Sequence, residues 1–187
     1  MGGGKIALHK VKVLMDFEAQ ITVIAPDILP EICKNSNVTC QKRCFEENDL
    51  DGQELVVAAT GDAALNHWLS GECKKNKIPV NVVDEPEECS FIFPAYLKEG
   101  EVVAAFSSGG QSPVITQYLK EQMRPVMAPQ IGEVARCLGN LRETVQKNPK
   151  TRDAGKQIYR ELLQLSIEMD RIPKDEEIRR VIQKYMQ

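Results

Sequence analysis

The sequence has few aromatic residues, only two histidines and no long apolar run. Aromatic side chains make up 5% of the 187 residues, so a folded core must be built mainly from aliphatic residues. No apolar run approaches the roughly 20 residues that a membrane-spanning helix needs. The N-terminus also lacks the basic region followed by an apolar region that marks a signal peptide. These absences predict a cytoplasmic protein with no membrane partner.

An excess of basic charge and a clear metal-ligand pattern are absent as well. The formal net charge is −3, which argues against general binding of nucleic acid by a basic surface. Six cysteines are present without any Cys-x-x-Cys pair. In a reducing cytosol we expect them to be free thiols. Cys33, Cys40 and Cys44 lie close in sequence and leave a zinc site as an alternative, but we favour small buried apolar residues and predict no metal.

The first residues carry a glycine-rich turn. Gly2, Gly4 and Ala7 fit the spacing Gly-x-Gly-x-x-Gly/Ala of a dinucleotide-binding turn, in which the glycines let the backbone approach a pyrophosphate. A helix that follows such a turn offers free N–H groups to the phosphates. An ordinary flexible loop is the alternative. The strand that should precede the glycines is absent, because the sequence begins at Met1.

Apolar runs and helical periodicity alternate along the first half of the chain, which predicts a parallel sheet with helices on both faces. The length suffices for one large domain or one domain with a helical appendage. The strands expected are 21–25, 38–43, 55–59, 79–83, 90–93 and 102–106. The helices expected are 5–18, 28–34, 62–76 with Asp62 as its cap, 113–123, 129–147, 151–169 and 174–186.

Polar residues follow several of the expected strands, and ligands of open α/β folds bind at the carboxyl ends of the strands. Asp27 follows the first strand and suits an adenosine ribose or, alternatively, a helix N-cap. Asp84 follows the fourth strand and suits proton transfer or, alternatively, a turn. The loop from Ser107 to Gly110 precedes a helix that Ser112-Pro113 opens, and is either an anion site or an ordinary tight loop.

Several motifs occur in a fixed order, and together they resemble a known family. They are Gly2-Gly-Gly-Lys-Ile-Ala7, Thr22-Val-Ile-Ala-Pro26, Ala58-Ala-Thr-Gly-Asp62 with Asn66, Asn81-Val-Val-Asp84, Ser90-Phe-Ile-Phe-Pro94 and Ser107-Ser-Gly-Gly-Gln-Ser-Pro113. This order is similar to that of precorrin-2 dehydrogenase, the dehydrogenase module of siroheme synthase. The resemblance is close over residues 2–125, and the helical remainder carries no sharp motif.

The resemblance implies a fold and an activity. The fold is α/β: a Rossmann-like NAD-binding domain at 1–87 whose first strand is missing, a small α/β dimerisation segment at 88–125, and a helical C-terminal domain at 126–187. The activity implied is oxidation of precorrin-2 to sirohydrochlorin with NAD as hydride acceptor, by a homodimer. Some members of the family also insert Fe²⁺ as a substrate to give siroheme, and the sequence leaves that step open.

The resemblance also implies roles for individual residues. Asp84 is the catalytic acid–base residue. The substrate-binding residues are Ser107, Ser108, Gly109 and Gly110. The cofactor-binding residues are Gly2, Gly3, Gly4, Lys5, Ile6, Pro26, Asp27, Thr60, Gly61 and Asn66. From the residues alone, Asn66 suits a cofactor contact and a turn cap equally.

Two rival hypotheses remain at this point. The first is a dinucleotide-binding regulatory module without catalysis; Asp84 and the Ser107–Gly110 loop favour an enzyme, because a sensor needs neither. The second is a truncated, weakly active member of the family, because loss of a central strand would expose apolar edges on both neighbouring strands.

Overall fold

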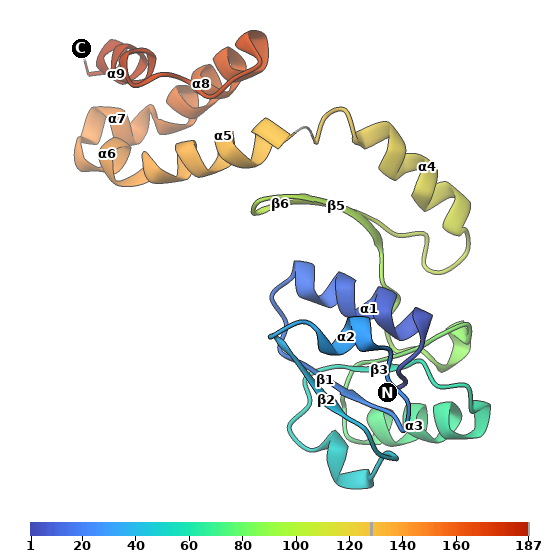
Figure 1. Ribbon diagram of the computed structural model, residues 1–187. Helices are drawn as coiled ribbons and strands as arrows, with labels where there is room; N and C mark the ends of the chain where they lie inside the picture. The colour runs from blue at the N-terminus through green and yellow to red at the C-terminus, as the bar shows by residue number, and fades with distance from the viewer. Residues whose placement is uncertain (128, 187) are drawn as a thin grey trace. The chain divides into compact units, whose positions relative to one another are not determined.

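The computed structural model describes residues 1–127 and 129–186 (Figure 1). The chain divides into two compact units. Unit 1 contains Met1–Phe93 together with Gly109–Gln111. Unit 2 contains Pro94–Ser108 and the chain from Ser112 onward.

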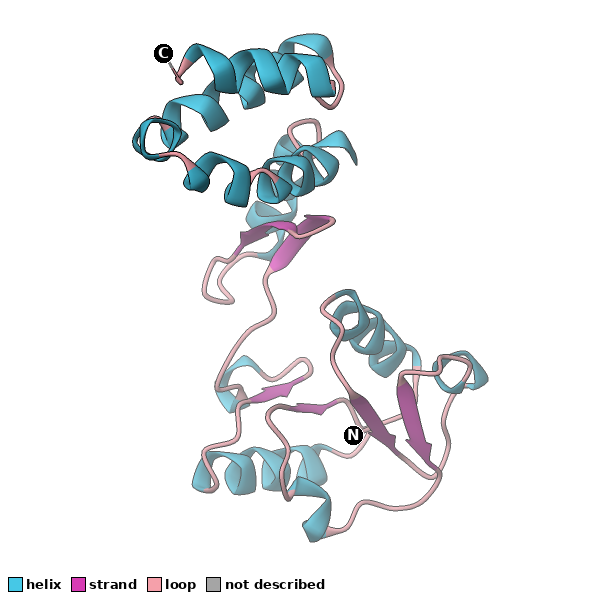
Figure 2. Ribbon diagram, turned by 90° about the vertical axis from the view of Figure 1, so that its left-hand side faces the viewer, coloured by secondary structure: helices cyan, strands magenta, loops and turns pink. Residues whose placement is uncertain are grey.

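Unit 1 is an α/β unit. Its elements in order are α1 (Lys5–Asp16), β1 (Ile21–Ile24), α2 (Pro30–Cys33), β2 (Val38–Gln41), the 3-10 helix η1 (Glu47–Leu50), β3 (Val56–Ala58), α3 (Ala63–Lys75), β4 (Val80–Val82) and the 3-10 helix η2 (Pro86–Glu88). The strands form two parallel pairs, β1 with β2 and β3 with β4 (Figure 2). Helices α1 and α2 lie on one side of the strands and α3 on the other (Figure 1). The predicted α/β class is therefore confirmed.

Each strand pair has its own aliphatic core. The first core joins α1, β1, α2 and β2 through buried residues that include Val11, Val23 and Ile32. The second joins β3, α3 and β4 through residues that include Ala58 and Leu69. The fully buried side chains of the two cores are aliphatic apart from Cys73, in keeping with the scarcity of aromatic residues. The cores fix the strand ends that carry the candidate site residues.

The first two residues lie between the two strand pairs and connect them. The Met1 nitrogen donates to the Val57 carbonyl at 2.8 Å, and the Ala59 N–H donates to the Met1 carbonyl at 2.9 Å. On the other side, the Gly2 N–H donates to the Ile24 carbonyl at 3.0 Å. Met1 and Gly2 therefore occupy part of the position expected for the strand that precedes a glycine-rich turn.

Burial of the Met1 nitrogen makes the stability of the fold depend on pH. Desolvation lowers the pKa of the α-ammonium group from its usual 8.0 to about 6, and the nearby Cys73 acts in the opposite direction. Between these values the unfolded chain binds a proton that the folded chain does not. The free energy of unfolding should therefore increase as the pH rises from 6 to 8, by roughly 2 to 3 kcal/mol from this group.

Denaturant unfolding at pH 6, 7 and 8 measures this dependence. The control is the same chain acetylated at the Met1 nitrogen, which retains every other titrating group. We expect acetylation to abolish the increase contributed by the amine. An identical pH dependence in both forms would show that the amine is charged and solvated in the folded state.

Cys33 and Cys40 form a disulfide, with their Cα atoms 5.9 Å apart. The prediction of free thiols was therefore wrong for these two residues. The reason is tertiary: α2 packs beside β2, so the end of the helix meets a strand residue seven positions later. Cys44, Cys73, Cys89 and Cys137 are free thiols.

Unit 2 combines a hairpin with a set of helices. Its elements are β5 (Ala95–Glu99), β6 (Val102–Phe106), α4 (Pro113–Met123), α5 (Pro129–Asn140), α6 (Arg142–Lys147), α7 (Pro149–Asp153), α8 (Gly155–Met169) and α9 (Asp175–Lys184). β5 and β6 are antiparallel. Ser112 caps α4 by accepting from the Ile115 N–H at 3.3 Å, and Pro113 is its first residue, as predicted.

Two predictions in this part of the chain were wrong in detail. Residues 90–93 are not a strand; the strand is β5, at 95–99. The turn at Gly100, with φ of 59°, places Glu99 opposite Val102, and this register selects β5 as the partner of β6. The helices expected at 129–147 and 151–169 are each divided in two, near Leu141 and Ala154.

Candidate functional site

The glycine turn brings the start of α1 against two other segments. A Cβ atom on Gly2 would lie 2.2 Å from the Ala59 carbonyl oxygen, and one on Gly3 would lie 2.1 Å from the Asp27 carbonyl oxygen. Gly2 also has a φ of 99°. Both positions therefore require glycine for packing. A Cβ on Gly4 would meet no atom within 4 Å.

The open space at Gly4 coincides with the N-terminus of α1. Gly4 is the N-cap residue, and no side chain caps the helix. The first N–H groups of α1 therefore remain available, and the helix dipole places partial positive charge beside them. Lys5 and Ile6 follow in the first turn and are exposed. This geometry suits the pyrophosphate of a dinucleotide.

Pro26 and Asp27 lie directly after β1 and are exposed. The loop that they begin is fixed to the glycine turn, because the Leu29 N–H donates to the Gly3 carbonyl at 2.9 Å. The N-cap of α2 is Leu29, so the alternative that Asp27 caps this helix was wrong. The backbone of Asp27 therefore lies beside the glycine turn, and the residue has no capping role.

Thr60 and Gly61 follow β3 and are held by Asn66 from inside α3. The Thr60 hydroxyl donates to Asn66 Oδ1 at 2.6 Å, and Asn66 Nδ2 donates to the Thr60 carbonyl at 3.3 Å. Asn66 is buried. Both ends of its amide group therefore hydrogen-bond to Thr60 and stabilise the turn. A Cβ atom on Gly61 would meet no atom within 4 Å. Asp62 caps α3, as predicted, by accepting from the Leu65 N–H at 3.1 Å.

Asp84 lies just beyond β4, exposed and with a φ of 62°. The turn that carries it is closed by the Cys89 thiol. Cys89 Sγ accepts from the Val82 N–H and donates to the Val82 carbonyl, each at 3.1 Å. Because Val82 is buried at the end of β4, the carboxylate of Asp84 stands on a fixed backbone.

Lys10 is a charged residue of this region that the sequence analysis missed. Its Nζ atom lies 4.4 Å from the centroid of the Phe93 ring. Burial lowers the pKa of Lys10, while attraction to Cys89 and Asp84 opposes that decrease. The spacing of residues in the sequence could have indicated this position. Lys10 follows the buried Ala7 by three residues, and residues three apart lie on the same face of a helix.

The loop between β6 and α4 contains the four residues predicted to bind substrate. Ser108 Oγ accepts from the Ser112 N–H at 2.9 Å, so this hydroxyl shapes the loop. Gly109 and Gly110 have positive φ values of 61° and 83°. Ser107 and Ser108 belong to unit 2, whereas Gly109 and Gly110 belong to unit 1. Within unit 1, a Cβ on Gly110 would contact the Ile92 side chain at 3.5 Å.

Over 1–127 and 129–186, no group of three or more histidine, cysteine, aspartate or glutamate side chains is placed to hold a metal ion. In the same part of the chain, no helix is both long enough and apolar enough to cross a membrane.

A glycine turn that opens a helix, beside the carboxyl ends of parallel strands, defines an α/β dinucleotide-binding protein. A family model described as NAD(P)-binding matches residues 1–95. The chain belongs to this NAD(P)-binding family.

Known proteins extend the comparison beyond the first unit. The chain is 36% identical over 150 residues to a siroheme synthase of Methylococcus capsulatus, covering 79% of this chain and 32% of that protein. It is 38% identical over 149 residues to a siroheme synthase of Pseudomonas fluorescens, covering 78% and 32%. The chain thus spans about a third of the length of the curated relatives it matches.

A solved structure matches nearly the whole chain. The structure of SirC, a precorrin-2 dehydrogenase, aligns with a TM-score of 0.74 and 23% sequence identity. The alignment covers 99% of this chain and 91% of that one. The two proteins therefore share a fold over both units.

Proposed function

We propose that this protein oxidises precorrin-2 to sirohydrochlorin with NAD⁺ as the hydride acceptor. The observation that carries the proposal is the presence, in one unit, of an open glycine turn at α1 and of an exposed carboxylate, Asp84, directly after β4. The names of the relatives, siroheme synthase and precorrin-2 dehydrogenase, support the choice of substrate.

The proposed reaction divides two hydrogens of the macrocycle between two acceptors. NAD⁺ supplies the hydride-accepting ring, and the second hydrogen leaves as a proton. In the proposal the Gly2–Gly4 turn and the N-terminus of α1 hold the pyrophosphate, Pro26 and Asp27 contact the adenosine ribose, and Thr60, Gly61 and Asn66 line the nicotinamide side. Asp84 accepts the proton.

The substrate is a polycarboxylate and needs sites for anions. We assign this role to the backbone N–H groups and hydroxyls of Ser107–Gly110, beside the N-terminus of α4. In the proposal, insertion of Fe²⁺ as a second substrate uses Asp84 to deprotonate the pyrroles.

We also propose a division into three domains, at 1–87, 88–125 and 126–187, and a cytoplasmic location for the protein.

Formation of NADH from enzymatically made precorrin-2, followed by absorbance, tests the proposed function. We expect NADH and sirohydrochlorin to form in equal amounts. Saturable binding of NAD⁺ without any NADH formation would favour the regulatory module instead.

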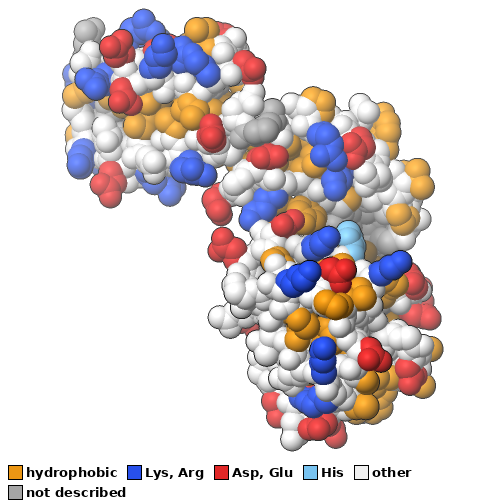
Figure 3. All heavy atoms as spheres, in the orientation of Figure 1, with side chains coloured by type: hydrophobic (Ala, Val, Ile, Leu, Met, Phe, Trp, Pro, Cys, Tyr) orange, Lys and Arg blue, Asp and Glu red, His pale blue; other side chains and the backbone are white. Residues whose placement is uncertain are grey.

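A homodimer is the second part of the proposal. Helix α4 carries exposed apolar side chains, among them Val114 with 78% of its surface exposed, Ile115 with 55% and Tyr118 with 61% (Figure 3). Exposed apolar side chains gathered on one helix favour association with a second copy. Sedimentation velocity of the purified chain measures the oligomeric state, and Tyr118→Glu should shift a dimer towards monomer.

The position of Asp27 predicts the choice of cofactor. A carboxylate beside the adenosine ribose would repel the 2′-phosphate of NADP⁺, so we expect NAD⁺ to bind more tightly. Asp27→Asn should narrow the difference by raising the affinity for NADP⁺. Fluorescence titrations of both variants with both cofactors measure this. Tighter NADP⁺ binding by the parent chain would contradict the role of Asp27.

A further inference from the structure

The outer edge of β4 is covered by a loop segment. Within the described residues, β4 pairs with β3 as a two-stranded sheet. On its other edge, the Ser90 N–H donates to the Val80 carbonyl at 2.8 Å, and the Val80 N–H donates to the Ser90 hydroxyl at 2.8 Å. The segment that begins at Cys89 therefore follows the edge of β4.

The Cys89 thiol completes this edge at Val82. Val82 is the last residue of β4 and is buried, so its N–H and C=O groups need partners inside the protein. Cys89 Sγ accepts from that N–H and donates to that carbonyl, each at 3.1 Å. One side-chain atom thus supplies the donor and the acceptor that an adjacent strand would supply.

The same sulfur reaches the backbone on both sides of Asp84. Besides its two contacts with Val82, Sγ lies 3.4 Å from the Glu85 carbonyl oxygen, within reach of the thiol hydrogen. Asp84 has a φ of 62°, a left-handed conformation that a residue with a Cβ atom keeps only where its surroundings impose it. The thiol therefore ties together the two ends of the turn that carries Asp84.

Neighbouring contacts fix the thiol in turn. The buried Asn81 donates through Nδ2 to the Phe91 carbonyl at 3.1 Å, and the same nitrogen lies 3.5 Å from Cys89 Sγ. The Cys89 N–H donates to the Pro86 carbonyl at 3.1 Å. A cysteine that only filled space in the core would need no such set of polar contacts.

We propose that Cys89 is a positioning residue for the proposed reaction: its thiol holds the turn from which Asp84 presents its carboxylate. The inference rests on the proposed function, in which Asp84 accepts the proton. A general base must lie within hydrogen-bond reach of the proton that it takes. A turn that loses its conformation therefore lowers the rate even though the carboxylate is still present.

Three variants test the proposal. Cys89→Ala removes the thiol, whereas Cys89→Ser retains a group that both donates and accepts. Cys73→Ala is the matched control, because Cys73 is buried in the core that contains Val82 but lies on α3. Hydrogen exchange at the Val82 amide, relative to the Leu69 amide in α3, reports whether the turn stays closed and requires no activity.

We expect Cys89→Ala to speed relative exchange at Val82 by about tenfold or more, and Cys89→Ser to restore most of the protection. Cys73→Ala should affect both amides by a similar factor. Unchanged relative exchange in Cys89→Ala would overturn the proposal. If Cys89→Ala does not fold, Cys89→Val, which fills the space without a polar atom, replaces it and carries the same expectation.

Rates of NADH formation from precorrin-2 show whether the thiol acts through Asp84. Cys89→Ala should lower kcat by about tenfold or more and leave the Kd for NAD⁺ unchanged. In an Asp84→Asn background the same substitution should have little further effect, because the two residues act as a unit. Losses that multiply would show that Cys89 supports the fold in general and would overturn the positioning role. A parent chain that forms no NADH would contradict the proposed function instead, and exchange at Val82 would then decide by itself whether the thiol holds the turn.

Discussion

Replacing Asp84 by asparagine is expected to lower the rate of precorrin-2 oxidation by about 10²-fold or more, the range for loss of a positioned general base. Asparagine keeps the size of the side chain and removes its capacity to accept a proton. The affinity for NAD⁺ should barely change, because Asp84 lies beyond β4 whereas the glycine turn lies at the start of α1. The measurements are single-turnover NADH formation and a separate NAD⁺ titration.

The matched control is Glu85→Gln, which removes a neighbouring exposed carboxylate from the same turn. We expect it to retain the parent rate. If Asp84→Asn oxidises precorrin-2 at the parent rate, Asp84 is a structural turn residue and catalysis depends on positioning of the cofactor alone. Equal losses in the two variants would indicate a general effect of charge in this turn.

Two glycine substitutions are expected to have different effects: Gly4→Val should weaken NAD⁺ binding, whereas Gly2→Val should destabilise the fold. Gly4→Val adds a side chain to open space at the N-terminus of α1, so the fold should tolerate it while NAD⁺ binding weakens by about tenfold or more, or about 1.4 kcal/mol. Gly2→Val drives a Cβ into the Ala59 carbonyl at a positive φ, so it should destabilise the fold by about 3 kcal/mol or more.

Thermal unfolding and NAD⁺ titration of the two variants separate these effects. Gly3→Val should behave like Gly2→Val, because its Cβ would meet the Asp27 carbonyl. Unchanged NAD⁺ affinity in Gly4→Val would show that the pyrophosphate does not approach this turn. A stable Gly2→Val variant would show that the glycine turn is free to move away from β3.

Local sequence signals predicted most of the elements because those elements depend on neighbouring residues. The runs at 21–25 and 55–59 contain strands, and Asp62 and Ser112 cap the helices that follow them. The prediction failed at 90–93 because a hairpin register is set by its turn, here at Gly100, rather than by the most apolar run. The Cys33–Cys40 disulfide was missed because α2 and β2 meet only in the folded chain.

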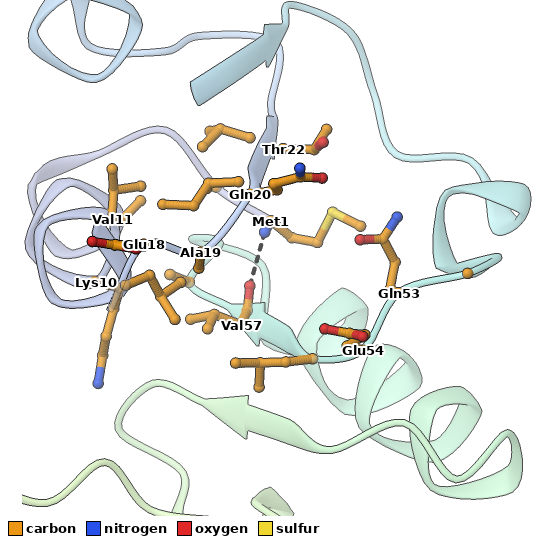
Figure 4. A pocket seen from close by; sticks show the side chains of 18 residues that line it. Met1, Lys10, Val11, Glu18, Ala19, Gln20, Thr22, Gln53, Glu54 and Val57 are labelled. Atoms are coloured by element: carbon orange, nitrogen blue, oxygen red, sulfur yellow. Dashed lines mark hydrogen bonds between the residues drawn. The ribbon is translucent and has the colours of Figure 1, made fainter. Parts of the chain in front are cut away.

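The sequence by itself determined the α/β class, the order of strands and helices, and the position of Asp27, Thr60 and Asp84 after three of the strands. These follow from periodicity and from residue preferences, which act over a few neighbouring positions. Only the tertiary structure decided that Gly2 and Gly3 are closed by packing while Gly4 is open, that Lys10 lies over the Phe93 ring, and that a groove lies beside Met1 (Figure 4). Each depends on contacts between segments that are separated in the chain and meet only when it folds.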